Sequence, residues 1–119
     1  MKLIRSFGYA IKGIYIATLE QLNIKIHFLA VAVVTIAGFF FHITLTEWCL
    51  IIVCFAMVLT AELMNSAIEN LVDLVSPGYH ALAGKVKDIA AGAVLVSAIA
   101  TGFIAILIFW KYLVSLFGL

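Results

Sequence analysis

The chain has 119 residues, of which 66% are hydrophobic and only 11% are charged. Soluble domains average about 45–50% apolar and about 25% charged residues, and a chain this short has too little interior to hide so much apolar surface from water. This composition excludes a soluble enzyme, a secreted disulfide scaffold and a disordered tail. The net charge of +1 is too small to indicate a nucleic-acid partner. We therefore expect one all-α membrane domain.

The N-terminal segment, residues 2–25, has apolar side chains at helical spacing, whereas Lys2, Arg5 and Lys12 fall elsewhere on the same helix. This pattern predicts an amphipathic helix that lies on the membrane surface. A simple surface anchor explains the pattern as well as a functional role does. The segment has no apolar run that ends in a small-residue cleavage site, so we expect no signal peptide.

Three apolar stretches follow, at about residues 28–45, 48–75 and 89–117, and each is long enough to cross a bilayer. Three spans put the two termini on opposite sides of the membrane. Six of the seven basic residues lie before the first span or between the second and third. By the positive-inside rule, the N-terminus and the polar segment 76–88 are cytosolic and the C-terminus is outside.

The cytosolic half of the second span contains polar residues where apolar ones are expected. Carboxylates near a bilayer are costly and tend to line a site. Glu62 lies about fourteen residues, or roughly 21 Å of helix, from Trp48, and we predict a functional role for it. For Asp73 two explanations stay open, because a carboxylate is also expected where a helix leaves the membrane. At about 100° per residue, one helix face presents Glu62, Asn65, Ser66, Glu69 and Asp73.

These positions suit phosphate chemistry at a membrane surface. A buried carboxylate such as Glu62 can act as a base within reach of a lipid head group. Glu69, two turns closer to the cytosol, suits Mg²⁺ held by one or two carboxylates and substrate phosphates. Lys87 and Asp88 can neutralise phosphate and hold metal or ribose, although lysines here also serve as topology markers.

The third span carries small residues four apart, a spacing that lets membrane helices pack closely; they are Ala93, Ser97, Thr101 and Ala105. Three spans enclose a polar site poorly, so we expect self-association. Two other functions stay open at this point. A small proton-coupled transporter subunit would use Glu62, and a structural membrane subunit would perform no chemistry.

The run from Glu62 to Asp73 reads E-x-x-N-S-A-I-E-x-x-V-D, and Tyr79-His80 and Lys87-Asp88-Ile-Ala-Ala-Gly-Ala follow it. This sequence resembles the prokaryotic integral-membrane diacylglycerol kinase family, which includes undecaprenol kinases, from about Gly8 to the C-terminus. The resemblance implies a homotrimer in the bacterial inner membrane, with a surface helix and three transmembrane helices per subunit. It also implies transfer of the ATP γ-phosphate to a lipid hydroxyl at the cytosolic face, with Mg²⁺.

The resemblance further implies roles for individual residues. Glu62 matches the general base, Asn65 a catalytic-site residue and Glu69 the carboxylate that holds the metal on the ATP phosphates. The lipid entrance would be bordered by Asn23, Lys25 and His27, with Trp48 at the far interface. The positions that match nucleotide contacts are Tyr9, Glu69, Gly78, Tyr79, His80, Lys87 and Asp88.

The sequence departs from the family pattern at one metal position. Family members usually carry a second metal-binding glutamate before the first span, and its place here is Gln21, with Glu20 one residue earlier. A shift of one residue turns a helical side chain by about 100°, so the resemblance leaves the second metal contact open. It also leaves the acceptor open between diacylglycerol and undecaprenol, both of which offer a primary hydroxyl.

Overall fold

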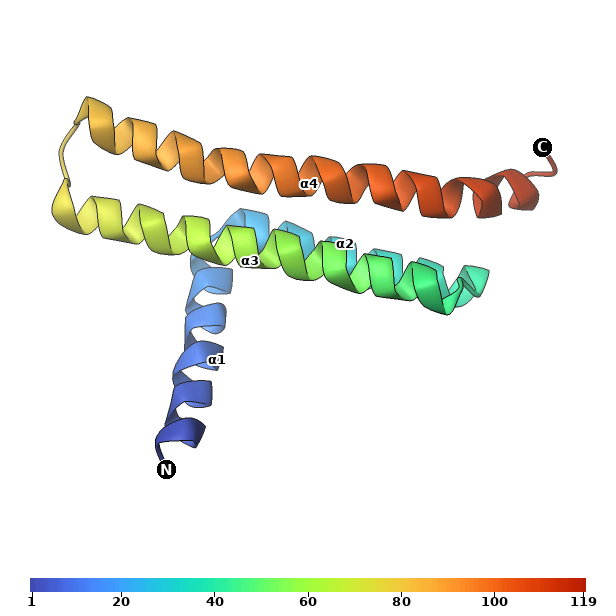
Figure 1. The fold of residues 1–119 in the computed structure, drawn as a ribbon, viewed down its shortest axis with the longest axis horizontal. Helices are drawn as coiled ribbons and strands as arrows, with labels where there is room; N and C mark the ends of the chain where they lie inside the picture. The colour runs from blue at the N-terminus through green and yellow to red at the C-terminus, as the bar shows by residue number, and fades with distance from the viewer.

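A computed structural model describes all residues, 1–119, and shows four helices and no strand (Figure 1). Three of these helices are long and apolar enough to cross a membrane. The predicted all-α membrane fold, with one N-terminal helix and three apolar helices, is confirmed. The helices are α1 (Lys2–Glu20), α2 (Leu22–Phe41), α3 (Leu45–Val75) and α4 (Ala81–Leu116).

The two longest helices, α3 and α4, run antiparallel along the length of the molecule, and α2 lies beside α3 (Figure 1). Helix α1 projects away from this bundle, from a point nearer the α3–α4 connection than the C-terminus. Such an arrangement suits an amphipathic helix that lies along a membrane surface while the other three cross it.

The break between the first two helices differs from the prediction. Helix α1 ends at Glu20, Gln21 has an extended backbone (φ −114°, ψ 114°), and α2 already begins at Leu22 rather than near residue 28. Asn23, Lys25 and His27 therefore lie in the first turns of α2 and not at the end of the surface helix. No glycine or proline marks this break, and apolar residues continue across it. Neither turn residues nor hydropathy could therefore locate it in the sequence.

The other two helices also begin earlier than predicted. Helix α3 begins at Leu45 because Thr44 and Glu47 form a capping box, in which each side chain accepts a hydrogen bond from the other's backbone N–H. Helix α4 begins at Ala81, not near residue 89, and His80 caps it. The prediction assigned residues 76–88 to the polar segment between two spans, but the alanine, leucine and lysine residues within it favour a helix.

Close packing holds the bundle together at the end away from the α3–α4 connection. Gly38 is required there, because a Cβ atom at this position would lie 2.5 Å from the Trp48 ring. Ser97 is buried, and the Thr101 hydroxyl donates a hydrogen bond to the Cys54 carbonyl at 3.4 Å. The small residues of α4 thus allow close approach to α3, as their spacing indicates. Both cysteines are free.

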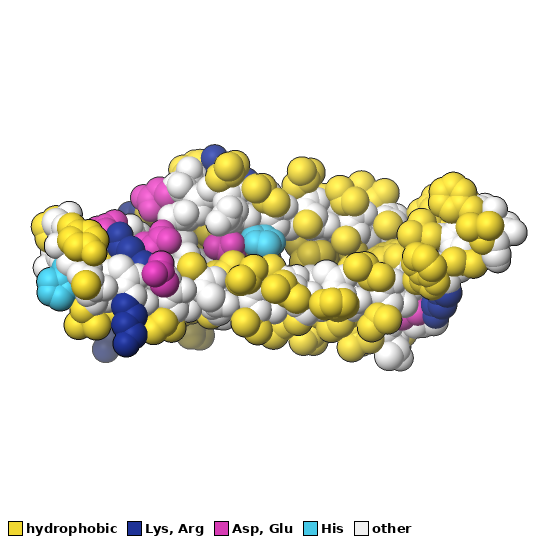
Figure 2. All heavy atoms as spheres, turned by 90° about the horizontal axis from the view of Figure 1, so that it is seen from above, with side chains coloured by type: hydrophobic (Ala, Val, Ile, Leu, Met, Phe, Trp, Pro, Cys, Tyr) yellow, Lys and Arg dark blue, Asp and Glu magenta, His cyan; other side chains and the backbone are white.

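Charged side chains are unevenly distributed over the molecule. Figure 2 shows most of them gathered toward the end with the α3–α4 connection, a long apolar stretch next to them, and a second, smaller charged group at the other end. An apolar stretch between two polar ends is typical of a protein that spans a membrane.

Candidate active site along the polar row of α3

We call Glu62, Asn65, Glu69 and Asp73 the polar row of α3. These side chains follow one face of the helix toward its C-terminal end, and their exposure increases in that direction. Glu62 is 2% exposed and Asn65 is 9% exposed, whereas Glu69 is half-buried and Asp73 is exposed. The row therefore leads from a buried carboxylate to the open end of the α3–α4 pair.

The buried end of the row is linked to α2. The Glu62 Oε1 atom lies 3.1 Å from Nε2 of His27, and no other side chain forms a hydrogen bond with this carboxylate. The predicted role of His27 was to border a lipid entrance, so sequence reasoning placed the residue in the site but missed its contact with Glu62. His27 lies in the second turn of α2 and Glu62 lies past the middle of α3, so only the docking of α2 on α3 reveals that the two side chains meet.

Glu69 is held by two amide side chains. Nε2 of Gln21 donates to its Oε2 at 3.2 Å, and Nδ2 of Asn65 donates to its Oε1 at 3.3 Å. The Oδ1 atom of Asn65 is buried and has no hydrogen-bond partner. A carboxylate beside an unpaired amide oxygen offers the hard oxygen ligands that Mg²⁺ prefers when substrate phosphates complete its coordination. The residues present fit this cation.

Glu20 occupies a different environment. It lines a groove between α1 and α3, together with Ser66 and Asn70, and the buried hydroxyl of Ser66 has no hydrogen-bond partner. The extended backbone at Gln21 turns the two neighbouring side chains apart. Gln21, and not Glu20, therefore faces Glu69.

The exposed end of the row is linked to α4. Nζ of Lys87 lies 2.6 Å from Oδ1 of Asp73, and both side chains are partly exposed to solvent. The two residues line a hollow of about 170 Å³ with Gly78, Tyr79 and His80. Most residues predicted to contact a nucleotide thus gather at one place. Asp88 lies beside this hollow, in a groove that it shares with Tyr79.

Comparison with known proteins identifies the family. The sequence profile described as prokaryotic diacylglycerol kinase matches residues 8–109. The chain belongs to this family. Among its relatives, the undecaprenol kinase of Bacillus subtilis (strain 168) is 37% identical over 108 residues, which cover 91% of this chain and 88% of the relative.

Two diacylglycerol kinases are further relatives. That of Synechocystis sp. is 43% identical over 100 residues, covering 82% of this chain and 57% of the relative. That of Escherichia coli (strain K12) is 27% identical over 111 residues, covering 93% and 91%. The resemblance inferred from the E-x-x-N-S-A-I-E-x-x-V-D run is confirmed, and the names of the family and its members support a lipid kinase.

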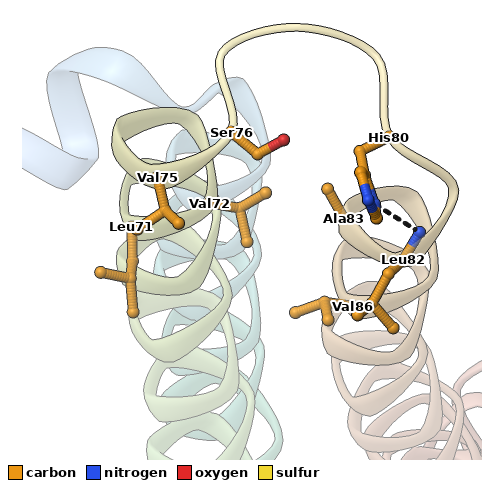
Figure 3. Close-up of a pocket in the computed structure, with 8 residues that line it drawn as sticks. All are labelled: Leu71, Val72, Val75, Ser76, His80, Leu82, Ala83 and Val86. Carbon is orange, nitrogen blue, oxygen red and sulfur yellow. Dashed lines mark hydrogen bonds between the residues drawn. The ribbon is translucent and has the colours of Figure 1, made fainter.

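The structure of this family member also has an apolar groove that the sequence did not predict. It lies between the facing ends of α3 and α4, where Ser76 and His80 border it (Figure 3). Nδ1 of His80 accepts a hydrogen bond from the Leu82 backbone N–H at 3.1 Å, so this nitrogen serves the helix cap. The sequence signal for this groove was the presence of apolar residues four apart on both helices. The apolar side chains that line the groove are Leu71, Val72, Val75, Leu82, Ala83 and Val86.

Four predicted site residues lie away from this group within one chain. Tyr9 is 73% exposed on α1, which runs away from α4 (Figure 1). Asn23 and Lys25 are exposed on the first turns of α2. Trp48 lies at the other end of α3, where its ring packs 5.0 Å from that of Phe39. A single chain does not bring these side chains to the polar row.

A second charged cluster, which sequence reasoning missed, surrounds Glu47 near the start of α3. Its carboxylate forms an ion pair with Lys111 and accepts a hydrogen bond from the Tyr112 hydroxyl at 2.6 Å. It also accepts a hydrogen bond from the Thr44 backbone N–H at 2.9 Å. The T-x-x-E pattern at Thr44 was a readable signal for the cap, but nothing in the sequence pairs Glu47 with α4.

Proposed function

We propose that this lipid kinase uses ATP and Mg²⁺ to phosphorylate the primary hydroxyl of diacylglycerol or undecaprenol at the cytosolic membrane interface. The observation that carries the proposal is the polar row, which joins a buried carboxylate near the apolar belt to a cation-holding carboxylate and a lysine at the exposed end. Along such a row a lipid hydroxyl would meet a nucleotide while the lipid tails stay in the membrane and the nucleotide stays in water.

Glu62 is the proposed general base. It is buried at the apolar end of the polar row, where it would meet the hydroxyl of a lipid whose tails stay among apolar helix faces. As the hydroxyl oxygen bonds to the γ-phosphorus, the hydroxyl proton moves to Glu62 and the bond to the ADP oxygen breaks. This is a direct transfer without a phosphoenzyme, in which positioning and charge neutralisation supply most of the acceleration.

Glu69 and the Oδ1 atom of Asn65 are the proposed metal ligands. Mg²⁺ bound there would neutralise the charge of the ATP phosphates during transfer. Gln21 positions the Glu69 carboxylate by donating a hydrogen bond to its Oε2 atom. A glutamate at this position would instead give the metal a second carboxylate ligand. Lys87 is the proposed phosphate ligand, and it would exchange its ion pair with Asp73 for the nucleotide.

The remaining assignments place the substrates around this centre. The nucleotide would occupy the hollow at the α3–α4 connection, with Gly78, Tyr79, His80 and Asp88 around it and Tyr9 of a neighbouring copy reaching it. The lipid would approach past α1 and the exposed side chains of Asn23 and Lys25, with Trp48 at the far interface. Supporting this path, the groove between α1 and α3 combines apolar walls with the polar groups of Glu20, Ser66 and Asn70.

Assembly and orientation belong to the same proposal. We infer a homotrimer, because one chain leaves Glu69 half-buried and Tyr79 98% exposed, and neighbouring copies would enclose them. The N-terminus and the α3–α4 connection would face the cytosol by the positive-inside rule, with the C-terminus outside. The transporter alternative is not favoured by the family match, and it leaves the exposed half of the polar row unused.

Lipid-dependent ATP consumption tests the proposal. The purified chain in detergent is given Mg²⁺ with ATP or GTP, and diacylglycerol, undecaprenol or no lipid. We expect consumption with ATP and at least one of the two lipids, and none without lipid. A transporter or a structural subunit would give no lipid-dependent consumption, and this result would contradict the proposed kinase.

A further inference from the structure

His27 is the only side chain that forms a hydrogen bond with the buried carboxylate of Glu62. The Nε2 and Oε1 atoms lie 3.1 Å apart, and the Glu62 side chain is 3% exposed whereas that of His27 is 20% exposed. The pair therefore connects an enclosed carboxylate with an imidazole that is partly exposed at the surface of the chain.

A buried base has to release the proton that it accepts before the next turnover. The polar neighbours of Glu62 on α3 offer no route, because the Asn65 amide donates to Glu69 and the Ser66 hydroxyl forms no hydrogen bond. An imidazole is suited to this task, because it can accept a proton at one nitrogen and release one from the other near neutral pH. The other two histidines, His42 and His80, lie in the α2–α3 and α3–α4 connections.

We propose that His27 is a positioning residue for Glu62 and carries the substrate proton from this carboxylate to water. The inference rests on the proposed function, since it requires Glu62 to be the base. After phosphoryl transfer, the Glu62 carboxylic acid gives its proton to Nε2 of the His27 tautomer that is protonated at Nδ1. The imidazolium then loses the Nδ1 proton to water.

The proton balance of the reaction is satisfied by this route. One proton leaves the lipid hydroxyl in each turnover and one proton reaches the solvent, while Glu62 and His27 regain their starting charges. Between transfers, Nε2–H of His27 donates to the Glu62 carboxylate and holds it in place, until the partly exposed ring exchanges tautomers with water. Positioning and proton release thus use the same hydrogen bond.

Chemical rescue of His27→Ala tests this role. We expect the variant to bind ATP with the parent KM but to lose about 10²-fold in kcat, the usual size of a proton-transfer contribution. Imidazole added to the assay should restore kcat in proportion to the concentration of its neutral form, because it can enter the space that the ring leaves. A merely structural histidine would not give rescue that follows the base concentration.

Two further variants keep the test decisive if His27→Ala folds poorly. His27→Gln retains an amide N–H toward Glu62 but cannot carry a proton, so we expect a low kcat that imidazole does not restore. Thr35→Ala is the matched control on α2, since Thr35 bonds only the Val31 carbonyl, and it should keep the parent kcat.

The outcomes separate this inference from the proposed function. If His27→Gln turns over at the parent rate while Glu62→Gln is inactive, the proton-carrying role of His27 is wrong and the base assignment stands. The same holds if folded His27→Ala is impaired but insensitive to imidazole. If Glu62→Gln itself turns over at the parent rate, the base assignment fails and this inference fails with it.

Discussion

Helix α3 carries two buried carboxylates, Glu47 in its first turn and Glu62 past its middle, and their hydrogen-bonding environments differ. Glu47 has three partners at its two oxygens, which are the Lys111 ammonium, the Tyr112 hydroxyl and the Thr44 backbone N–H. Glu62 has one partner, His27, although it is the more deeply buried of the two. The Glu47 carboxylate is fully paired, whereas the Glu62 carboxylate retains unused hydrogen-bonding capacity.

This difference separates stabilisation from function. Buried polar groups are normally fully hydrogen-bonded, and a group that is not requires an explanation. Unpaired atoms occur beside Glu62, at Oδ1 of Asn65 and Oγ of Ser66, whereas none occurs around Glu47. The Glu47 cluster joins two helices, while the polar row has donors and acceptors left for substrates.

The largest effect is expected from Glu62→Gln. The amide keeps the shape of the side chain but cannot take the hydroxyl proton, so kcat for lipid phosphorylation should fall by about 10²–10⁴-fold. ATP affinity and the assembly state should stay at the parent values. Initial rates and ATP binding, both measured on the purified variant, check this expectation, and an unchanged kcat would show that Glu62 is not the base.

A smaller effect is expected from Lys87→Ala. Losing a charge-assisted contact worth about 1.5–3 kcal/mol should raise KM for ATP about 10- to 100-fold. Lys85→Ala on the same helix is the matched control, because Lys85 has no ion pair, and it should leave KM for ATP near the parent value. Equal KM values for both variants would remove Lys87 from the phosphate site.

Gln21→Glu tests the metal end of the polar row. A second carboxylate beside Glu69 should strengthen Mg²⁺ binding and lower the Mg²⁺ concentration for half-maximal activity by about tenfold, within the range known for groups around metal ligands. Glu20→Gln is the control, because Glu20 faces the groove between α1 and α3 instead. A Mg²⁺ titration that shifts for Glu20→Gln and not for Gln21→Glu would reverse this assignment.

The smallest effect on activity is expected from Glu47→Gln. The substitution weakens an ion pair and two hydrogen bonds that join α3 to α4 and cap α3, so the melting temperature in detergent should fall. The kcat of the folded protein should stay at the parent value, because Glu47 lies at the far end of α3 from the polar row. A large loss of kcat without loss of stability would show that the two ends are not functionally separate.

The sequence predicted the features that depend on composition and helical periodicity. The three apolar helices and the shared face of Glu62, Asn65, Glu69 and Asp73 follow from residue type and the turn of a helix. The break at Gln21 was missed because no proline or glycine marks it. The start of α4 at Ala81 was missed because its first turns belong to the polar segment that precedes the apolar stretch.

Contacts between helices were beyond the reach of the sequence alone. The pairings of His27 with Glu62, Gln21 with Glu69, and Lys111 with Glu47 join residues far apart in the chain, and they depend on how α2 and α4 dock on α3. Charge complementarity alone would have allowed several other pairings.

Transfer of radiolabelled γ-phosphate from ATP to lipid tests the central claim most directly. The purified parent and Glu62→Gln proteins are compared with diacylglycerol and with undecaprenol, and the lipid is extracted and counted. We predict label in at least one of the lipids with the parent protein and only a small fraction of it with Glu62→Gln. No labelled lipid with the folded parent protein, or equal labelling by both proteins, would contradict the account.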